Sequence, residues 1–332
     1  MLSDCMATED QVLPASLTSP HPVRNPLAKR SGQNDGLRFG DCHRSRAFPW
    51  RQLLVLFKLR EVALLLFAGV GAAFLAAGGW PGSDHLTLLL ATGGVAAAGA
   101  SAINQYLERD LDGRMERTRR RPLVTKAISR PGWVPWVGAA MILGPSLAVL
   151  PVNPALGVFV MLGAAIYIGI YTAWLKPRTL LNVIIGGLAG SAAVLSGSAA
   201  AGRWNDPGAL LLALLVFLWT PTHFWSLAIA HRDDYARGGF PMLPVLITAR
   251  VAAGWVLFHT VATVCCALAL LTHPAMGWIY GIPAGLAGAV LIVHNLRLVA
   301  DPGADKALAL FHTSNLYLAV VILMICVDAL VA

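Results

Sequence analysis

Charged residues are scarce in this sequence. Only 13% of its 332 residues are Asp, Glu, Lys or Arg, whereas 57% are hydrophobic. A soluble globule of this length needs more polar surface, so the composition excludes one and predicts a polytopic membrane protein. The five cysteines include no pair with metal-site spacing, and we expect reduced, passive thiols. The first 47 residues lack the apolar run of a signal peptide, so no cleaved targeting segment is predicted.

Apolar runs close to the roughly 20 residues that a helix needs to cross a bilayer recur along the chain. Nine of them fall at 62–79, 85–107, 133–150, 155–174, 180–200, 209–230, 251–271, 276–296 and 308–331. Lipid offers no partner to an unpaired backbone group, and the runs are too long and too unalternating for barrel strands. The sequence therefore predicts an all-α protein with nine transmembrane helices.

The basic residues lie almost entirely on one side of this span map. Of the 25 lysines and arginines, 24 precede the first span or lie in even-numbered loops, and only Arg203 lies opposite. By the positive-inside rule, the N-terminus and the even-numbered loops are cytoplasmic and the C-terminus lies outside. The net charge of +8 thus reflects topology, and no nucleic-acid partner is expected.

The chain divides into two parts by composition. Residues 1–47 are rich in Ser, Pro, Arg and Asn and carry no apolar core, which predicts a disordered cytoplasmic tail. Residues 48–332 form the predicted transmembrane domain.

The clearest chemical signal is a run of acids and arginines at the end of the second span. Asn104, Glu108 and Asp112 stand at successive i, i+4 positions and share one helix face, and Arg117 and Arg121 repeat the spacing. Carboxylates ligate Mg²⁺, and guanidinium groups bind phosphate. A topology anchor needs only Lys or Arg, so it does not explain acids and an amide at this depth.

Two further polar clusters are expected at the same membrane face. One closes the sixth span and comprises His223, Asp233 and Asp234, after Pro221, which should bend the helix. The other flanks the turn after the fourth span and comprises Tyr167, Tyr171, Thr172, Lys176, Arg178, Thr179 and Asn182. Each cluster also has an alternative interpretation. His223 can be a packing residue, and the polar residues from Tyr167 to Asn182 can be snorkelling side chains with an aromatic belt. Because all three clusters face one compartment, we expect them to converge on one site.

Such a site suits the ionisation of an allylic diphosphate. Mg²⁺ and arginines would neutralise the charge that builds on the leaving diphosphate, while an apolar cavity would keep water from the electron-poor C1.

These motifs resemble the UbiA-type intramembrane prenyltransferases, and in detail their heme O synthase (protoheme IX farnesyltransferase) subfamily. The resemblance lies in NQYLERDLDGRMERTRRRPL at 104–123, YTAWLKPRTLLNVIIGGLAG at 171–190 and HFWSLAIAHRDDYARGGFPMLPV at 223–245. It implies nine transmembrane helices around a central cavity, in a bacterial cytoplasmic membrane. It also implies transfer of a farnesyl group from farnesyl diphosphate to a vinyl group of heme b, with addition of water, giving heme o for heme-copper oxidases. Mg²⁺ is the implied cofactor, and heme A synthase or oxidase assembly factors are candidate partners.

The same resemblance implies roles for individual residues. Glu108, Asp112 and Asp233 would bind Mg²⁺, with Asn104 and Asp234 completing the catalytic set. The diphosphate would be bound by Arg109, Arg117, Arg121, Lys176 and Arg232, although Arg117 or Arg121 could pair with heme propionates instead. His223 would contact the substrate heme.

Three departures from the family pattern keep alternatives open. Leu59 and Thr222 each replace a proline, and residues 191–197 differ from the usual segment at the far end of the fifth span. This last change leaves room for another aromatic or tetrapyrrole acceptor. A non-catalytic heme-binding assembly factor is the other alternative. A transporter is disfavoured, because the polar groups gather at one face and form no path through the midplane.

Overall fold

The computed structural model describes residues 50–331, and the predicted tail lies outside this range. Within it the chain is helical and contains no strand. The long helices are α2 (Leu59–Ala77), α3 (Ser83–Asp112), α4 (Val134–Val149), α5 (Pro154–Ala165), α6 (Asn182–Ala200), α7 (Pro207–Ala230), α10 (Ala249–Ala269), α11 (Trp278–Ala300) and α12 (Ala304–Val331). The short ones are α1 (Trp50–Phe57), α8 (Arg232–Arg237) and α9 (Leu243–Leu246). A π-helix, Ile166–Leu175, continues α5.

The nine predicted membrane spans are confirmed for the described residues. The segments long and apolar enough to cross a membrane are Leu59–Ala77, Ser83–Asp112, Pro131–Val149, Pro154–Leu175, Asn182–Ala200, Pro207–Ala230, Ala249–Thr272, Trp278–Ala300 and Ala304–Val331. The second span was predicted too short, since it continues past residue 107 to Asp112. Hydropathy falls at Asn104, but the helix goes on because its polar side chains are buried against neighbouring elements.

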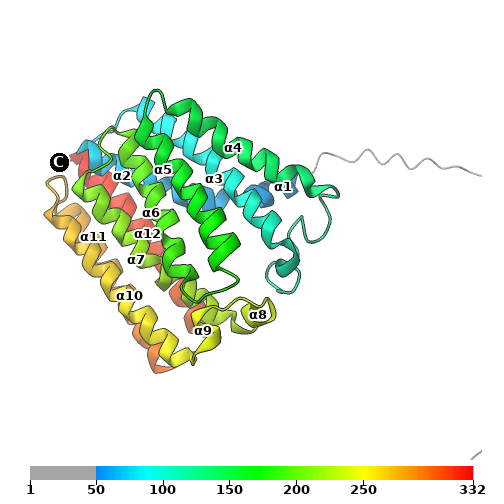
Figure 1. The fold of residues 1–332 in the computed structure, drawn as a ribbon. Helices are drawn as coiled ribbons and strands as arrows, with labels where there is room; N and C mark the ends of the chain where they lie inside the picture. The colour runs from blue at the N-terminus through cyan, green and yellow to red at the C-terminus, as the bar shows by residue number, and fades with distance from the viewer. Residues whose placement is uncertain (1–49, 332) are drawn as a thin grey trace, which may run out of the picture. The chain divides into compact units, whose positions relative to one another are not determined.

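The long helices pack side by side, mostly in chain order (Figure 1). Helix α2 contacts α3, α6, α7 and α12, so the first span lies against both early and late helices and closes the bundle. Many Leu and Val side chains, such as Leu143, Leu214 and Leu286, remain exposed on the outer surface. An apolar exterior of this kind suits a protein surrounded by lipid.

The unusual 191–197 segment allows α6 to approach α2 closely. A Cβ atom at Gly197 would overlap the backbone carbonyl of Gly69. The Ser191 hydroxyl donates to the Ala213 carbonyl at 2.8 Å and thereby ties α6 to α7. Small residues let helix backbones approach in lipid, where van der Waals packing drives association. In this chain the segment therefore serves helix packing.

Gly197→Ala should destabilise the bundle. Overpacking typically costs about 1–3 kcal/mol, and we expect the upper end because the obstructing atom belongs to the backbone of α2. Thermal unfolding of the detergent-solubilised protein measures the effect as a lower Tm. Gly254→Ala in α10 is the matched control, because its added Cβ would meet no atom within 4 Å. Equal Tm values for the two variants would contradict the close approach.

Candidate active site

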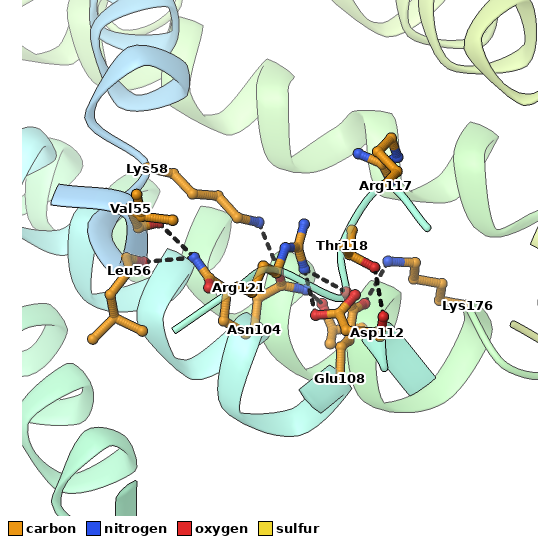
Figure 2. A network of polar contacts seen from close by, with 12 residues as sticks. Val55, Leu56, Lys58, Asn104, Glu108, Asp112, Arg117, Thr118, Arg121 and Lys176 are labelled. Atoms are coloured by element: carbon orange, nitrogen blue, oxygen red, sulfur yellow. Dashed lines mark hydrogen bonds and ion pairs between the residues drawn. The ribbon is translucent and has the colours of Figure 1, made fainter. Parts of the chain in front are cut away.

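The predicted polar face of α3 is buried inside the bundle. Asn104, Glu108 and Asp112 are 2, 4 and 1% exposed. Polar groups are stable at such depth only when they are paired. Figure 2 shows that side chains from three other parts of the chain reach this face. They are Lys58, which precedes α2, Lys176, which follows the π-helix, and Arg121 from the α3–α4 loop.

Asn104 links three elements. Its Oδ1 accepts a hydrogen bond from Lys58 Nζ at 2.8 Å, and its Nδ2 donates to Thr172 Oγ1 at 3.0 Å. Both ends of the amide are therefore held, which fixes the orientation of the side chain. The resemblance implied a catalytic role for Asn104, and these contacts would allow it to orient the neighbouring side chains of the site.

The two carboxylates of α3 face cations. Lys176 Nζ lies 2.5 Å from Glu108 Oε1, and Arg121 Nη1 lies 2.5 Å from Asp112 Oδ2. Arg121 is also 4.0 Å from Glu108 Oε2, so both carboxylates lie near one guanidinium. Among the described residues, the second oxygen of Asp112, Oδ1, is buried without a hydrogen-bond partner.

This pair of carboxylates fits a divalent cation shared with a diphosphate. Residues 50–331 contain no group of three or more His, Cys, Asp or Glu that would form a protein cage for a metal. Mg²⁺ does not need one, because it is usually held by one or two carboxylates together with substrate phosphates and water. The unpaired Oδ1 of Asp112 is an available hard ligand.

The π-helix brings aromatic rings to the same place. Its wide turn appears where the Lys176 amide donates to the Tyr171 carbonyl, five residues back, at 2.8 Å. The rings of Tyr167 and Tyr171 stack at 5.9 Å, and Lys176 Nζ lies 5.6 Å from the centre of the Tyr171 ring. Gly186 makes room, since a Cβ there would lie 2.6 Å from that ring. Short π-helical stretches often mark functional sites.

Asp234 connects the second predicted cluster to the first through the backbone. Its carboxylate accepts hydrogen bonds from the amides of Glu116 and Arg117, at 3.0 and 3.1 Å, and pairs with Arg237. Burial raises the pKa of Asp234, but these hydrogen bonds outweigh it and hold the pKa below its ordinary value. The Tyr235 hydroxyl accepts a further bond from Arg117 at 3.4 Å. Asp234 therefore positions the loop that carries Arg117 and Arg121.

Three other predicted site residues lie outside this network of polar contacts. Arg109 lies over the Tyr106 ring at 4.3 Å and pairs with Asp110. Arg232 donates to backbone carbonyls beyond α8, at 3.3 and 3.4 Å. Asp233 is exposed, and within the part of the chain that the structure describes its side chain has no hydrogen bond or ion pair. Their roles in binding diphosphate or metal remain predictions.

His223 lies in an aromatic sandwich between α7 and α12. Its ring stacks on Trp219 and Phe311, each at 4.4 Å, and its Nδ1 lies 3.1 Å from Ser314 Oγ. These contacts are those of a packing residue, as the alternative interpretation of the sequence expected. The side chain remains half-buried, and the predicted contact with heme is not tested by them.

Lys58 was not predicted as a site residue, because in the sequence it is one of the many basic residues that set the membrane topology. Its backbone is left-handed, with φ 47°, and this conformation separates α1 from α2. Burial, followed by the charge of Arg121, lowers the pKa of Lys58 to about 7. The only available signal was its place directly before the first span, beside Arg60.

Asp234→Asn should loosen the α3–α4 loop. We expect the KM for a prenyl diphosphate to rise about tenfold, because hydrogen bonds to a charged group contribute about 1.5–3 kcal/mol. The depressed pKa means that the ionised tether is fully present above the ordinary value of 3.8 and is lost only as the pH falls through the lower native value. Steady-state kinetics at neutral pH measures the change. Asp301→Asn, which removes an exposed acid paired with Lys306, is the control.

Comparison with known proteins decides the family. Residues 64–319, most of the described chain, match the UbiA prenyltransferase family. The protein belongs to this family. As a UbiA prenyltransferase it is a multi-pass membrane enzyme, and the predictions of an all-helical fold and of prenyl transfer are confirmed.

Relatives of this UbiA prenyltransferase include two proteins named protoheme IX farnesyltransferase. The one from Metallosphaera sedula is 38% identical over 276 residues, which are 83% of this chain and 95% of the relative. Protoheme IX farnesyltransferase 1 from Saccharopolyspora erythraea is 41% identical over 284 residues, 84% of this chain and 89% of the relative.

Solved structures share the fold. A digeranylgeranylglyceryl phosphate synthase aligns with TM-score 0.71 at 14% identity, over 85% of this chain and 99% of its own. A UbiA homolog from Archaeoglobus fulgidus bound to DMAPP and Mg²⁺ aligns with TM-score 0.58 at 19% identity, over 83% and 99%.

Proposed function

We propose that this protein transfers a farnesyl group from farnesyl diphosphate to a vinyl group of heme b, giving heme o and diphosphate. The observation that carries the proposal is the buried pair Glu108 and Asp112, each facing a cation at one end of the bundle. Relatives at 38 and 41% identity that are named protoheme IX farnesyltransferase support heme b as the acceptor.

The residues of the site suit each part of this reaction. Glu108 and Asp112 would hold Mg²⁺, which would supply positive charge to the diphosphate; the C1–O bond breaks and its electron pair leaves with the diphosphate oxygen. Lys176 and Arg121 would bind the same group, and Asn104 would hold Lys58 in place. The stacked rings of Tyr167 and Tyr171 would exclude water from C1.

Bond formation then involves the acceptor. The terminal vinyl carbon forms a bond to C1 of the farnesyl group, and the positive charge moves to the carbon attached to the macrocycle. Water adds there and loses a proton, which leaves a hydroxyl group. Atoms and charge balance without an oxidant or a reductant.

The orientation and cellular partners are part of the proposal. The one-sided distribution of basic residues supports a site at the cytoplasmic face of the membrane. The resemblance to heme O synthases implies that this is a bacterial cytoplasmic membrane. The product would serve heme-copper oxidases, with heme A synthase or assembly factors as neighbours.

The test uses the purified full-length protein in detergent with heme b, farnesyl diphosphate and Mg²⁺. Heme o should appear in extracts separated by liquid chromatography and identified by mass. Absence of heme o together with prenylation of a quinone precursor would refute the proposed acceptor and move the protein to another branch of the family.

A further inference from the structure

A pocket outside the carboxylate site opens between α1, α2 and α3. Its volume is about 460 Å³, and Lys58, Arg60 and Arg121 line it together with one acid, Glu61. The apolar part of the wall comes from Leu54, Val55 and Leu59. Each of these three is about half exposed, at 53, 51 and 47%, so the apolar wall lies at the surface of the bundle.

Two cations of this pocket, Lys58 and Arg60, differ from those that face the carboxylates. Lys176 and Arg121 each pair with an acid of α3. Lys58 instead donates to the neutral amide of Asn104, and among residues 50–331 neither Lys58 nor Arg60 has an ion pair. Both side chains can therefore pair with an anionic ligand, and a carboxylate bound at Lys58 would favour its charged form, because an opposite charge raises the pKa that burial lowers to about 7.

The pocket has a built framework. Gln105 Nε2 donates to the carbonyls of Val55 and Leu56, at 2.7 and 3.0 Å, and so fixes the end of α1 against α3. The left-handed backbone at Lys58 turns the chain between α1 and α2, and its side chain reaches inward to Asn104 (Figure 2). A non-glycine residue in this conformation is uncommon, and such residues cluster at ligand-binding sites.

The pocket adjoins the carboxylate site. Arg121 lines it and also contacts Asp112. Figure 2 shows Lys58 at one end of the polar network and Lys176 at the other, with Arg121 between them. Two anionic groups can therefore bind at the two ends of one network, with a cation between them to limit their repulsion.

We propose that this pocket binds the carboxylate edge of the tetrapyrrole acceptor, with its propionates on Lys58 and Arg60, while the diphosphate binds on the Lys176 side. The inference rests on the proposed function, because it takes heme b as the acceptor. The two propionates of heme b lie on one edge of the macrocycle and its vinyl groups lie toward the other. Propionates bound at Lys58 would direct the vinyl edge of the heme toward Glu108 and Lys176, where C1 of the prenyl chain would lie.

The chemistry of the pocket favours a tetrapyrrole carboxylate. Two cations without acidic partners match two carboxylates, and charge-assisted hydrogen bonds are about twice as strong as neutral ones. The apolar wall suits a flat, hydrophobic ring that enters from the lipid side. The pocket is too small to enclose a macrocycle and suits only its edge.

The test compares protoporphyrin IX with its dimethyl ester, which has the same ring and no free carboxylate. Binding to the full-length protein in neutral detergent is followed by quenching of tryptophan fluorescence, without farnesyl diphosphate. The wild type should bind the free acid at least about tenfold more tightly than the ester, as expected for charge-assisted hydrogen bonds. Lys58→Gln/Arg60→Gln should bind both within about twofold of each other, with ester affinity unchanged.

Two controls keep the result interpretable. Lys58→Arg retains the charge and should retain the preference for the free acid, which also shows that the position tolerates substitution. Arg250→Gln removes an exposed arginine at the start of α10 that donates only to the Ala300 carbonyl among the described residues, and it should behave as the wild type.

Several results would overturn the proposal. They are a preference for the free acid that persists in the double variant, equal binding of acid and ester by the wild type, and a double variant that loses farnesyl diphosphate binding instead. Competition by phosphatidylglycerol added to the micelles would assign the pocket to a lipid headgroup. If heme o forms but the preference is absent, only this inference fails. If the preference is present but no heme o forms, only the proposed reaction fails.

Discussion

Glu108→Gln and Asp112→Asn will each lower the kcat of prenyl transfer by about a thousandfold, the loss expected when one strong electrostatic group is removed from a low-dielectric site. Each amide keeps the shape of the acid but removes a negative charge that lies 2.5 Å from a cation. Product formation under saturating substrates measures the effect. A variant with more than a tenth of wild-type activity would show that its carboxylate is not part of the machinery.

Asp110→Asn is the matched control for both variants. It lies on the same helix, but its side chain is 82% exposed and pairs only with Arg109 among the described residues. Its activity should stay near the wild-type value. The same variants distinguish an enzyme from a heme-binding assembly factor, because heme delivery by a carrier would survive loss of Glu108 or Asp112.

Removal of divalent cations by a chelator will abolish prenyl transfer without unfolding the protein. We expect activity to fall by at least about a hundredfold, because a bound metal contributes several kcal/mol to transition-state stabilisation. The fold should persist because, without metal, Glu108 still pairs with Lys176 and Asp112 with Arg121. Activity and Tm are measured on the same sample.

Added Mg²⁺ in excess of the chelator should restore the activity, and a chelator already saturated with Mg²⁺ should have no effect. Undiminished turnover after exhaustive chelation would exclude a role for metal at the two carboxylates. A large fall in Tm would contradict the pairing with cations.

Helical periodicity was sufficient to find the face of α3. Asn104, Glu108 and Asp112 are spaced so regularly that any helix places them together, and their polarity at this depth indicated a site. The nine spans followed in the same way from the length of the apolar runs. Both inferences use the pattern of residues within a single segment, and the sequence shows such a pattern directly.

Other features of the site depend on contacts that side-chain patterns do not reveal. Asp234 was predicted as part of the catalytic set, but its hydrogen bonds to the backbone amides of Glu116 and Arg117 were not predicted, because every residue type except proline supplies such an amide. From the sequence, Lys58 is one of the basic residues that set the membrane topology, and only its contact with Asn104 assigns it to the site. The π-helix was not predicted, because its sequence, IYIGIYTAWL, is equally compatible with an ordinary α-helix.

The wide winding of Ile166–Leu175 has a consequence for how this chain tolerates insertions and deletions. A helical residue advances by about 100°, and a π-helical stretch accommodates one residue more per turn than regular winding does. Deletion of a single residue, such as Gly169, would remove a residue that the wide winding accommodates and would favour rewinding of the segment as a regular α-helix. The angles among Tyr167, Tyr171 and Lys176 around the helix axis would then change, so the length and winding of this segment together set the alignment between the stacked rings and the lysine.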